Sequence, residues 1–157
     1  MFKQVQVQLV QGYQIASGQS ETDTRFPEGT IKLQIPHFKN LGFDFDEYFK
    51  KNYVSGTLNL SVKNHTIEIA KPEYFFTNLK WSEIFPPENF FLSKAKVIFN
   101  NKSYTALLYI PDPSTKVDHF SVKSNIEVIA QRIENIKYGD ILTLCYNPSA
   151  IKITVNK

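Results

Sequence analysis

The segment Gly56-Thr57-Leu58-Asn59 carries two oxygen-bearing side chains at alternate positions. In an extended strand, residues two apart point to the same face, so Thr57 and Asn59 would lie side by side while Leu58 points into the core. A hydroxyl oxygen and an amide oxygen suit Mg²⁺, which keeps several waters and takes further ligands from substrate phosphates. The pattern predicts a magnesium site, and a solvated strand surface is the alternative that the sequence leaves open.

Other residue types that perform catalysis are dispersed along the chain. His37, His65 and His119 are far apart, without a spacing typical of zinc ligands, and no Walker-type glycine-rich run ends in Lys-Ser or Lys-Thr. Cys145 is the only cysteine, and its apolar surroundings predict a buried, inert thiol with no disulfide or thiolate cluster. His119 is a candidate substrate contact that could lie near Thr57 at one open end of the fold, with an ordinary exposed histidine as the alternative.

Period-two alternation of apolar and polar residues predicts many short strands. It is clearest at 5–9, 31–35 and 58–62. Further strands are predicted at 66–70, 95–99, 104–110, 126–130, 141–146 and 151–155, with Asn100-Asn101-Lys102 as a hairpin turn. So many short strands favour a mainly β fold, namely a small closed β-barrel with one or two short helices.

The predicted helices are few and short. Asp44 would cap a turn or two that places Phe45, Tyr48 and Phe49 on one side. A second short helix is predicted to start near Asn78 and to stop before the two prolines at 86–87.

The stretch 72–91 is dense in aromatic residues. Because large apolar groups are usually buried, we interpret it as core or as a packed loop. The alternative is a docking face for a protein partner, which joint exposure of Trp81 and Phe85 would favour.

Composition sets limits on the class of protein. The 157 residues, 42% hydrophobic and 21% charged, predict one domain over 1–157. The net charge of +3 comes from basic residues scattered among acids, so we expect no nucleic-acid partner. The apolar windows are far shorter than the roughly 20 residues of a membrane span, and the N-terminus reads as a strand instead of a signal peptide. We therefore expect a cytoplasmic protein without membrane association, and the oligomeric state stays open.

Several short motifs occur in the order found in archaeal-type CTP-dependent riboflavin kinases. They are GYQIASG at 12–18, NLGF at 40–43, SGTLNL at 55–60, NIEVIA at 125–130 and YGDI at 138–141. Together they span nearly the whole chain, and the Gly-Thr-Leu-Asn element is the most specific of them. The chain therefore resembles this family. The resemblance implies a small closed barrel with cradling loops, in which the γ-phosphate of CTP is transferred to the primary hydroxyl of riboflavin to give FMN.

The resemblance also implies roles for individual residues. Thr57 and Asn59 would be the Mg²⁺ ligands, and Glu127 would contact the flavin, with a solvated strand-edge carboxylate as the alternative for Glu127. Thr115, in the loop before Glu127, would be a further flavin contact by the resemblance, whereas His119 is a candidate flavin contact from its place in the same loop alone. Phosphoryl transfer needs in-line placement, a metal that bridges phosphate oxygens, and donors that offset the developing charge.

Nucleotide-binding residues are expected after the first strand and near the end of the chain. Ser17 and Gly18 stand where the family has a short glycine-rich loop, whose backbone amides can wrap a triphosphate. Arg25 and Arg132 would add positive charge for phosphate contacts. CTP is the donor that the resemblance implies, and another nucleoside triphosphate stays open.

Two departures from the family favour an alternative function. Glu21 and Asp23 lie in the expected nucleotide loop, where their carboxylates would repel phosphates. The segment 131–137 is shorter than the helical stretch that helps to hold the nucleotide in the family. The alternative is a flavin- or nucleotide-binding module on the same barrel that has no transfer activity.

Overall fold

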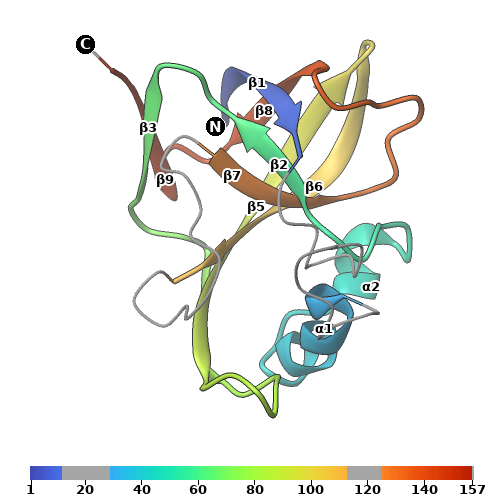
Figure 1. Cartoon of the computed structure of the whole chain (residues 1–157), viewed down its shortest axis with the longest axis vertical. Coiled ribbons are helices and arrows are strands. Elements are labelled where there is room, and N and C mark those ends of the chain that lie inside the picture. Colours follow the sequence, from blue (N-terminus) through green and yellow to red (C-terminus); the bar gives the residue numbers. More distant parts are fainter. Residues whose placement is uncertain (12–28, 113–124, 157) are drawn as a thin grey trace.

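The computed structural model describes residues 1–11, 29–112 and 125–156, and in these ranges it has nine strands and two helices (Figure 1). The strands are β1 (Lys3–Val10), β2 (Leu58–Ser61), β3 (His65–Ile69), β4 (Tyr74–Leu79), β5 (Glu88–Phe99), β6 (Lys102–Pro111), β7 (Asn125–Ala130), β8 (Ile141–Tyr146) and β9 (Ile151–Val155). The helices are α1 (Thr30–Asn40) and α2 (Phe45–Phe49).

Antiparallel pairing closes six of these strands into a barrel. The large sheet has the order β4-β5-β6-β7-β2-β1-β8, and an additional pairing joins β8, at one end of this order, back to β5. β4 is the extra strand outside the closed ring, while β3 and β9 form a separate two-stranded sheet. The expected mainly β fold with a small closed barrel and two short helices is therefore confirmed.

The long strand β5 belongs both to the barrel and to an arm of the sheet that extends beyond it. Its last residues, 95–98, pair with β8, whereas its first residues, 88–92, pair with β4. It pairs with β6 from residue 90 to residue 99. The predicted turn between them is confirmed, because Asn100 (φ 51°) and Asn101 (φ 63°) have the left-handed backbone of a tight hairpin turn.

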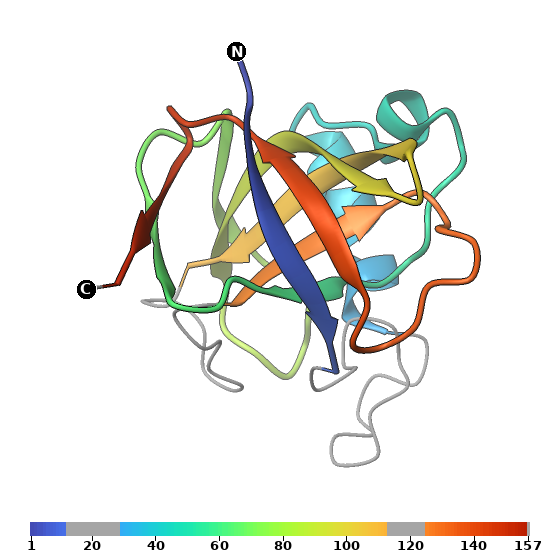
Figure 2. The same ribbon diagram turned by 90° about the horizontal axis from the view of Figure 1, so that it is seen from above.

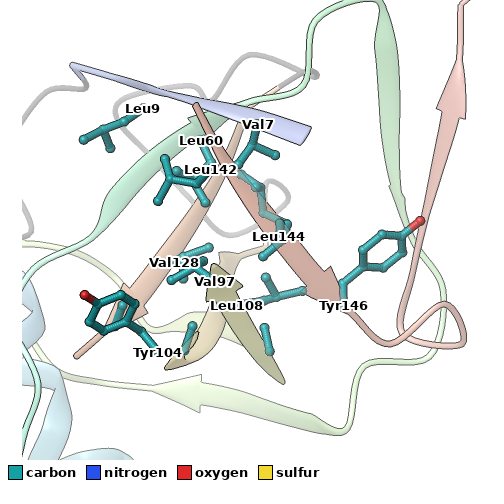
Figure 3. Packing of buried hydrophobic residues seen from close by; sticks show 14 of the residues in the cluster. Val7, Leu9, Leu60, Val97, Tyr104, Leu108, Val128, Leu142, Leu144 and Tyr146 are labelled. Atoms are coloured by element: carbon teal, nitrogen blue, oxygen red, sulfur yellow. The ribbon is translucent and has the colours of Figure 1, made fainter. Parts of the chain in front are cut away.

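Alternate residues of the six barrel strands fill its interior. Side chains from β1, β2, β5, β6, β7 and β8 meet there (Figure 3). The labelled members of this core are Val7, Leu9, Leu60, Val97, Tyr104, Leu108, Val128, Leu142, Leu144 and Tyr146. Because successive side chains of a strand point to opposite faces, the residues between them face outward.

A second core lies outside the barrel, where both helices cover the sheet. Seen from above, β1 and β8 run side by side across the front, and the helices lie behind them (Figure 2). Phe38 of α1 is fully buried, and its ring centroid lies 5.8 Å from that of Phe45, 5.3 Å from that of Phe76 and 5.4 Å from that of Phe90. These contacts join α1 to α2, β4 and β5.

The helix expected after Asp44 is confirmed as α2. The side chain of Asp44 accepts hydrogen bonds from the backbone N–H groups of Asp46 at 3.0 Å and of Glu47 at 3.4 Å. Asp44 thus satisfies amides that a helix start leaves unpaired. The cap fixes a helix whose two ends, Phe45 and Phe49, are both buried.

Replacing Asp44 by alanine should lower the free energy of unfolding by about 1 kcal/mol, because two amides lose their side-chain acceptor. In a chain of this size, the melting temperature should fall by about 2–4 °C. Differential scanning calorimetry would measure this loss. Asp44→Ser keeps a capping oxygen and serves as the control, so an equal loss in both variants would contradict the role of the cap.

The strand predicted at 31–35 is wrong, because these residues belong to α1. The buried positions Ile31, Gln34 and Phe38 follow helical spacing, while Leu33 is 41% exposed. Gln34 is buried although polar, since its side-chain oxygen accepts a hydrogen bond from the hydroxyl of Tyr109 at 2.6 Å. This buried amide makes the segment look like an alternating strand.

The helix predicted near Asn78 is also wrong. Asn78 lies in β4, where the pairing with β5 changes register between Phe76 and Leu79. Its φ of 53° is a conformation that asparagine tolerates, and its backbone N–H donates to the side chain of Asn89 at 2.9 Å. The segment from 80 to 87 is a loop.

The aromatic stretch contributes to the second core. Phe76 and Phe90 are buried, Phe85 packs at the edge, and Trp81 is only 8% exposed, with its indole N–H donating to Glu88 at 2.7 Å. The interpretation as packed core is confirmed for these residues. The docking alternative loses its main support.

Cys145 is buried, as predicted. No helix in the described ranges is both long enough and apolar enough to cross a membrane.

Candidate functional site

Thr57, Asn59 and Glu127 lie together on the barrel wall. β2 and β7 are antiparallel neighbours, and Asn59 stands directly opposite Glu127 in their register. Thr57, just before β2, donates a hydrogen bond from its hydroxyl to Oε1 of Glu127 at 2.9 Å. All three side chains are half-buried. Glu127, which is far from Thr57 and Asn59 in the sequence, thus lies beside them in the fold.

Side chains alternate between the inner and outer faces along β2 and β7, and this alternation places the three residues on the outer face of the barrel. Leu60 and Val128, which flank Asn59 and Glu127 along their strands, belong to the inner core. Asn59 and Glu127 must therefore point out of the barrel.

Backbone hydrogen bonds fix the segment that precedes β2. The N–H of Val54 donates to the carbonyl of Ala130 at 3.1 Å, and the N–H of Gly56 donates to the carbonyl of Val54 at 2.9 Å. The chain thus enters β2 tied to the end of β7. This anchoring holds Thr57 diagonally across from Glu127, within reach of its carboxylate.

Tyr109 of β6 lies on the other side of Glu127 from Asn59. It stands opposite Glu127 in the register of β6 and β7, and its hydroxyl donates to Gln34 of α1 at 2.6 Å. Burial raises the pKa of Tyr109 well above its usual value, and the carboxylates of Glu127 and Glu88 raise it further. Tyr109 is therefore a neutral donor that connects the site to α1.

Sequence reasoning missed Tyr109 and Gln34 as neighbours of the site. The signal available was the parity of the predicted strand 104–110, in which Tyr109 faces opposite to the core residue Leu108. Nothing in the sequence indicated Gln34, because its segment was interpreted as a strand.

Replacing Tyr109 by phenylalanine should lower the free energy of unfolding by about 1–3 kcal/mol, because the buried side-chain oxygen of Gln34 loses its donor. Chemical denaturation would measure the change. Tyr104→Phe is the matched control, since Tyr104 lies in the same strand with its ring in the barrel core. Equal stability of the Tyr109 variant and the wild type would contradict the role of this hydrogen bond.

The remaining predicted site residues are distributed differently. Arg132 is exposed in the loop that follows β7. The other five lie outside the described residues; they are Ser17, Gly18, Arg25, Thr115 and His119. β1 ends at Val10, which pairs with Asn59, so the segment predicted to bind the nucleotide follows a strand that ends beside the site.

The donor set of the site fits a hard cation. Thr57 offers a hydroxyl oxygen, Asn59 an amide oxygen and Glu127 a carboxylate, all of which are oxygen ligands of the kind that Mg²⁺ prefers. Within the described ranges, no group of three or more His, Cys, Asp and Glu residues could hold a metal ion. A cation at this spot would therefore keep several water or phosphate ligands of its own.

Comparison with models of known protein families gives no match, and comparison with curated proteins finds none that is significantly similar to this chain. A barrel by itself does not determine an activity, since one scaffold hosts many functions.

Proposed function

We propose that this chain is a Mg²⁺-dependent phosphotransferase that moves the γ-phosphate of a nucleoside triphosphate to the primary hydroxyl of riboflavin, giving FMN. The observation that supports this proposal is the meeting of Thr57, Asn59 and Glu127 on one half-buried patch of a closed barrel. These are the residues to which the resemblance gives the metal and flavin roles. We further propose a cytoplasmic location, where nucleoside triphosphates are available.

Each side chain has a defined task in this proposal. Thr57 and Asn59 would hold the cation through neutral oxygens, which leaves its charge for the phosphates. A bound Mg²⁺ would neutralise negative charge that develops on the phosphate oxygens during transfer. Glu127 would accept a hydrogen bond from the flavin, and the half-buried position of the patch would limit access of water to the reacting groups.

The donor nucleotide is proposed from the resemblance alone. CTP is the expected donor, with Ser17, Gly18, Arg25 and Arg132 as the proposed contacts. Thr115 and His119 would complete the flavin side.

Incubation of the purified full chain with riboflavin, Mg²⁺ and each nucleoside triphosphate in turn tests the proposal. Chromatography should detect FMN with at least one triphosphate, CTP first, and none after removal of the metal with EDTA. Absence of FMN with all four triphosphates would contradict the transferase assignment.

A flavin- or nucleotide-binding module without transfer activity is the second candidate. It is favoured by Glu21 and Asp23, the carboxylates in the expected nucleotide loop. A ligand at 100 times its Kd stabilises the folded state by about 2.7 kcal/mol. A rise in melting temperature with riboflavin or FMN but no product would favour this candidate, whereas neither a rise nor a product would contradict both.

A further inference from the structure

The hydrogen bond between Thr57 and Glu127 fixes the direction of the only proton on the Thr57 hydroxyl. An ionised carboxylate can only accept, so Thr57 is the donor of the 2.9 Å contact. A hydroxyl has one proton and two lone pairs. With its proton directed to Glu127, Thr57 presents its lone pairs away from the carboxylate, as ligation of a cation requires.

Tyr109 does not compete for this carboxylate from the β6 side. It is the cross-strand neighbour of Glu127, yet its single hydroxyl proton goes to Gln34 at 2.6 Å. The buried phenol instead forms an apolar wall beside Glu127. Low exposure on this side reduces solvent screening of the carboxylate charge.

The proposed metal ligands lack negative charge of their own. Thr57 and Asn59 are both neutral, so their oxygens alone bind a divalent cation weakly. Glu127 bonds to the first of them and stands directly opposite the second, where facing Cβ atoms are about 4.5–5.5 Å apart. A single carboxylate thus lies beside both ligands.

We propose that Glu127 is a positioning residue for the metal: its carboxylate orients the Thr57 hydroxyl and supplies the negative charge that the neutral ligand pair lacks. This role differs from the flavin contact that the resemblance implies. The inference rests on the proposed function, since it concerns the same cation. Partners that orient metal ligands typically contribute about 10- to 100-fold to metal affinity.

Direct binding of Mn²⁺, measured by electron paramagnetic resonance without nucleotide or flavin, tests the inference independently of turnover. Glu127→Ala should weaken Mn²⁺ binding by about 10- to 100-fold. Glu127→Gln keeps an acceptor for Thr57 but loses the charge, so it should bind Mn²⁺ more tightly than the alanine variant and more weakly than the wild type. Glu68→Gln removes an exposed carboxylate on β3 and should bind as the wild type does.

The outcomes separate this inference from the proposed function. Unchanged Mn²⁺ affinity in both Glu127 variants, with tight binding by the wild type, would overturn the positioning role alone. No Mn²⁺ binding by the wild type would overturn the metal site and the inference with it. If the alanine variant fails to fold, the nearly isosteric glutamine variant decides, because an affinity equal to that of the wild type would exclude a role for the charge.

Discussion

Thr57→Val and Asn59→Leu should each abolish Mg²⁺-dependent formation of FMN while leaving the barrel folded. Both substitutions roughly keep the size of the side chain and remove the oxygen proposed to ligate the metal. Loss of a direct ligand should exceed the 10- to 100-fold effect of an orienting partner, so we expect kcat/KM to fall by at least about 100-fold. Steady-state assays of FMN formation would measure the fall, and circular dichroism would verify the fold.

Ser61→Ala provides the matched control for this pair. Ser61 is in β2, two residues beyond Asn59, and its partner in the register is Asn125 instead of Glu127. Its loss should change turnover little. Full turnover in both the Thr57 and Asn59 variants would show that the assignment of metal ligands is wrong.

Phe38→Ala should remove a large part of the free energy of unfolding. The ring is fully buried among Phe45, Phe76 and Phe90, so its deletion leaves a cavity between α1 and the sheet. Such substitutions cost about 3–5 kcal/mol, against a total of about 5–15 kcal/mol for a typical domain. Denaturant unfolding followed by fluorescence would measure the loss.

Phe75→Ala is the matched control for Phe38. Phe75 is 51% exposed and stacks on Phe91 with ring centroids 4.5 Å apart. Removing it should cost about 1 kcal/mol, since an aromatic pair contributes about 0.5–1.5 kcal/mol beyond its burial. Equal losses in the two variants would contradict the second core as a main source of stability.

Local patterns were sufficient to predict most strands and the cap of α2. The period of two is clear in β1 and β2, where alternate residues lie in the barrel core. The cap at Asp44 depends only on adjacent residues, so it is equally visible in the sequence. Both features are decided by interactions within a few residues.

The two wrong elements depend on distant partners. Gln34 is buried because Tyr109, 75 residues away, donates to it, and this contact cannot be recognised locally. Asn78 is accommodated in a bulge of β4 where its amide bonds to Asn89 of β5. In both cases tertiary pairing overrides the pattern along the chain.

The candidate site shows the same division. Thr57 and Asn59 can be paired from the sequence, because residues two apart in a strand share a face. The place of Glu127 depends on the register of β2 against β7, and these two strands lie far apart in the sequence. Before the structure, only the family resemblance linked Glu127 to Thr57 and Asn59. The neighbouring Tyr109 requires in addition the register of β6, which closure of the barrel determines.

Anomalous X-ray diffraction from crystals of the full chain grown with Mn²⁺ tests the central claim most directly. The account predicts an anomalous peak within about 2.3 Å of both the Thr57 hydroxyl oxygen and the Asn59 amide oxygen, near the distances at which hard cations bind oxygen. Glu127 should then retain its hydrogen bond to Thr57. A peak elsewhere on the protein, or FMN formation by a protein with no metal at these two oxygens, would contradict it.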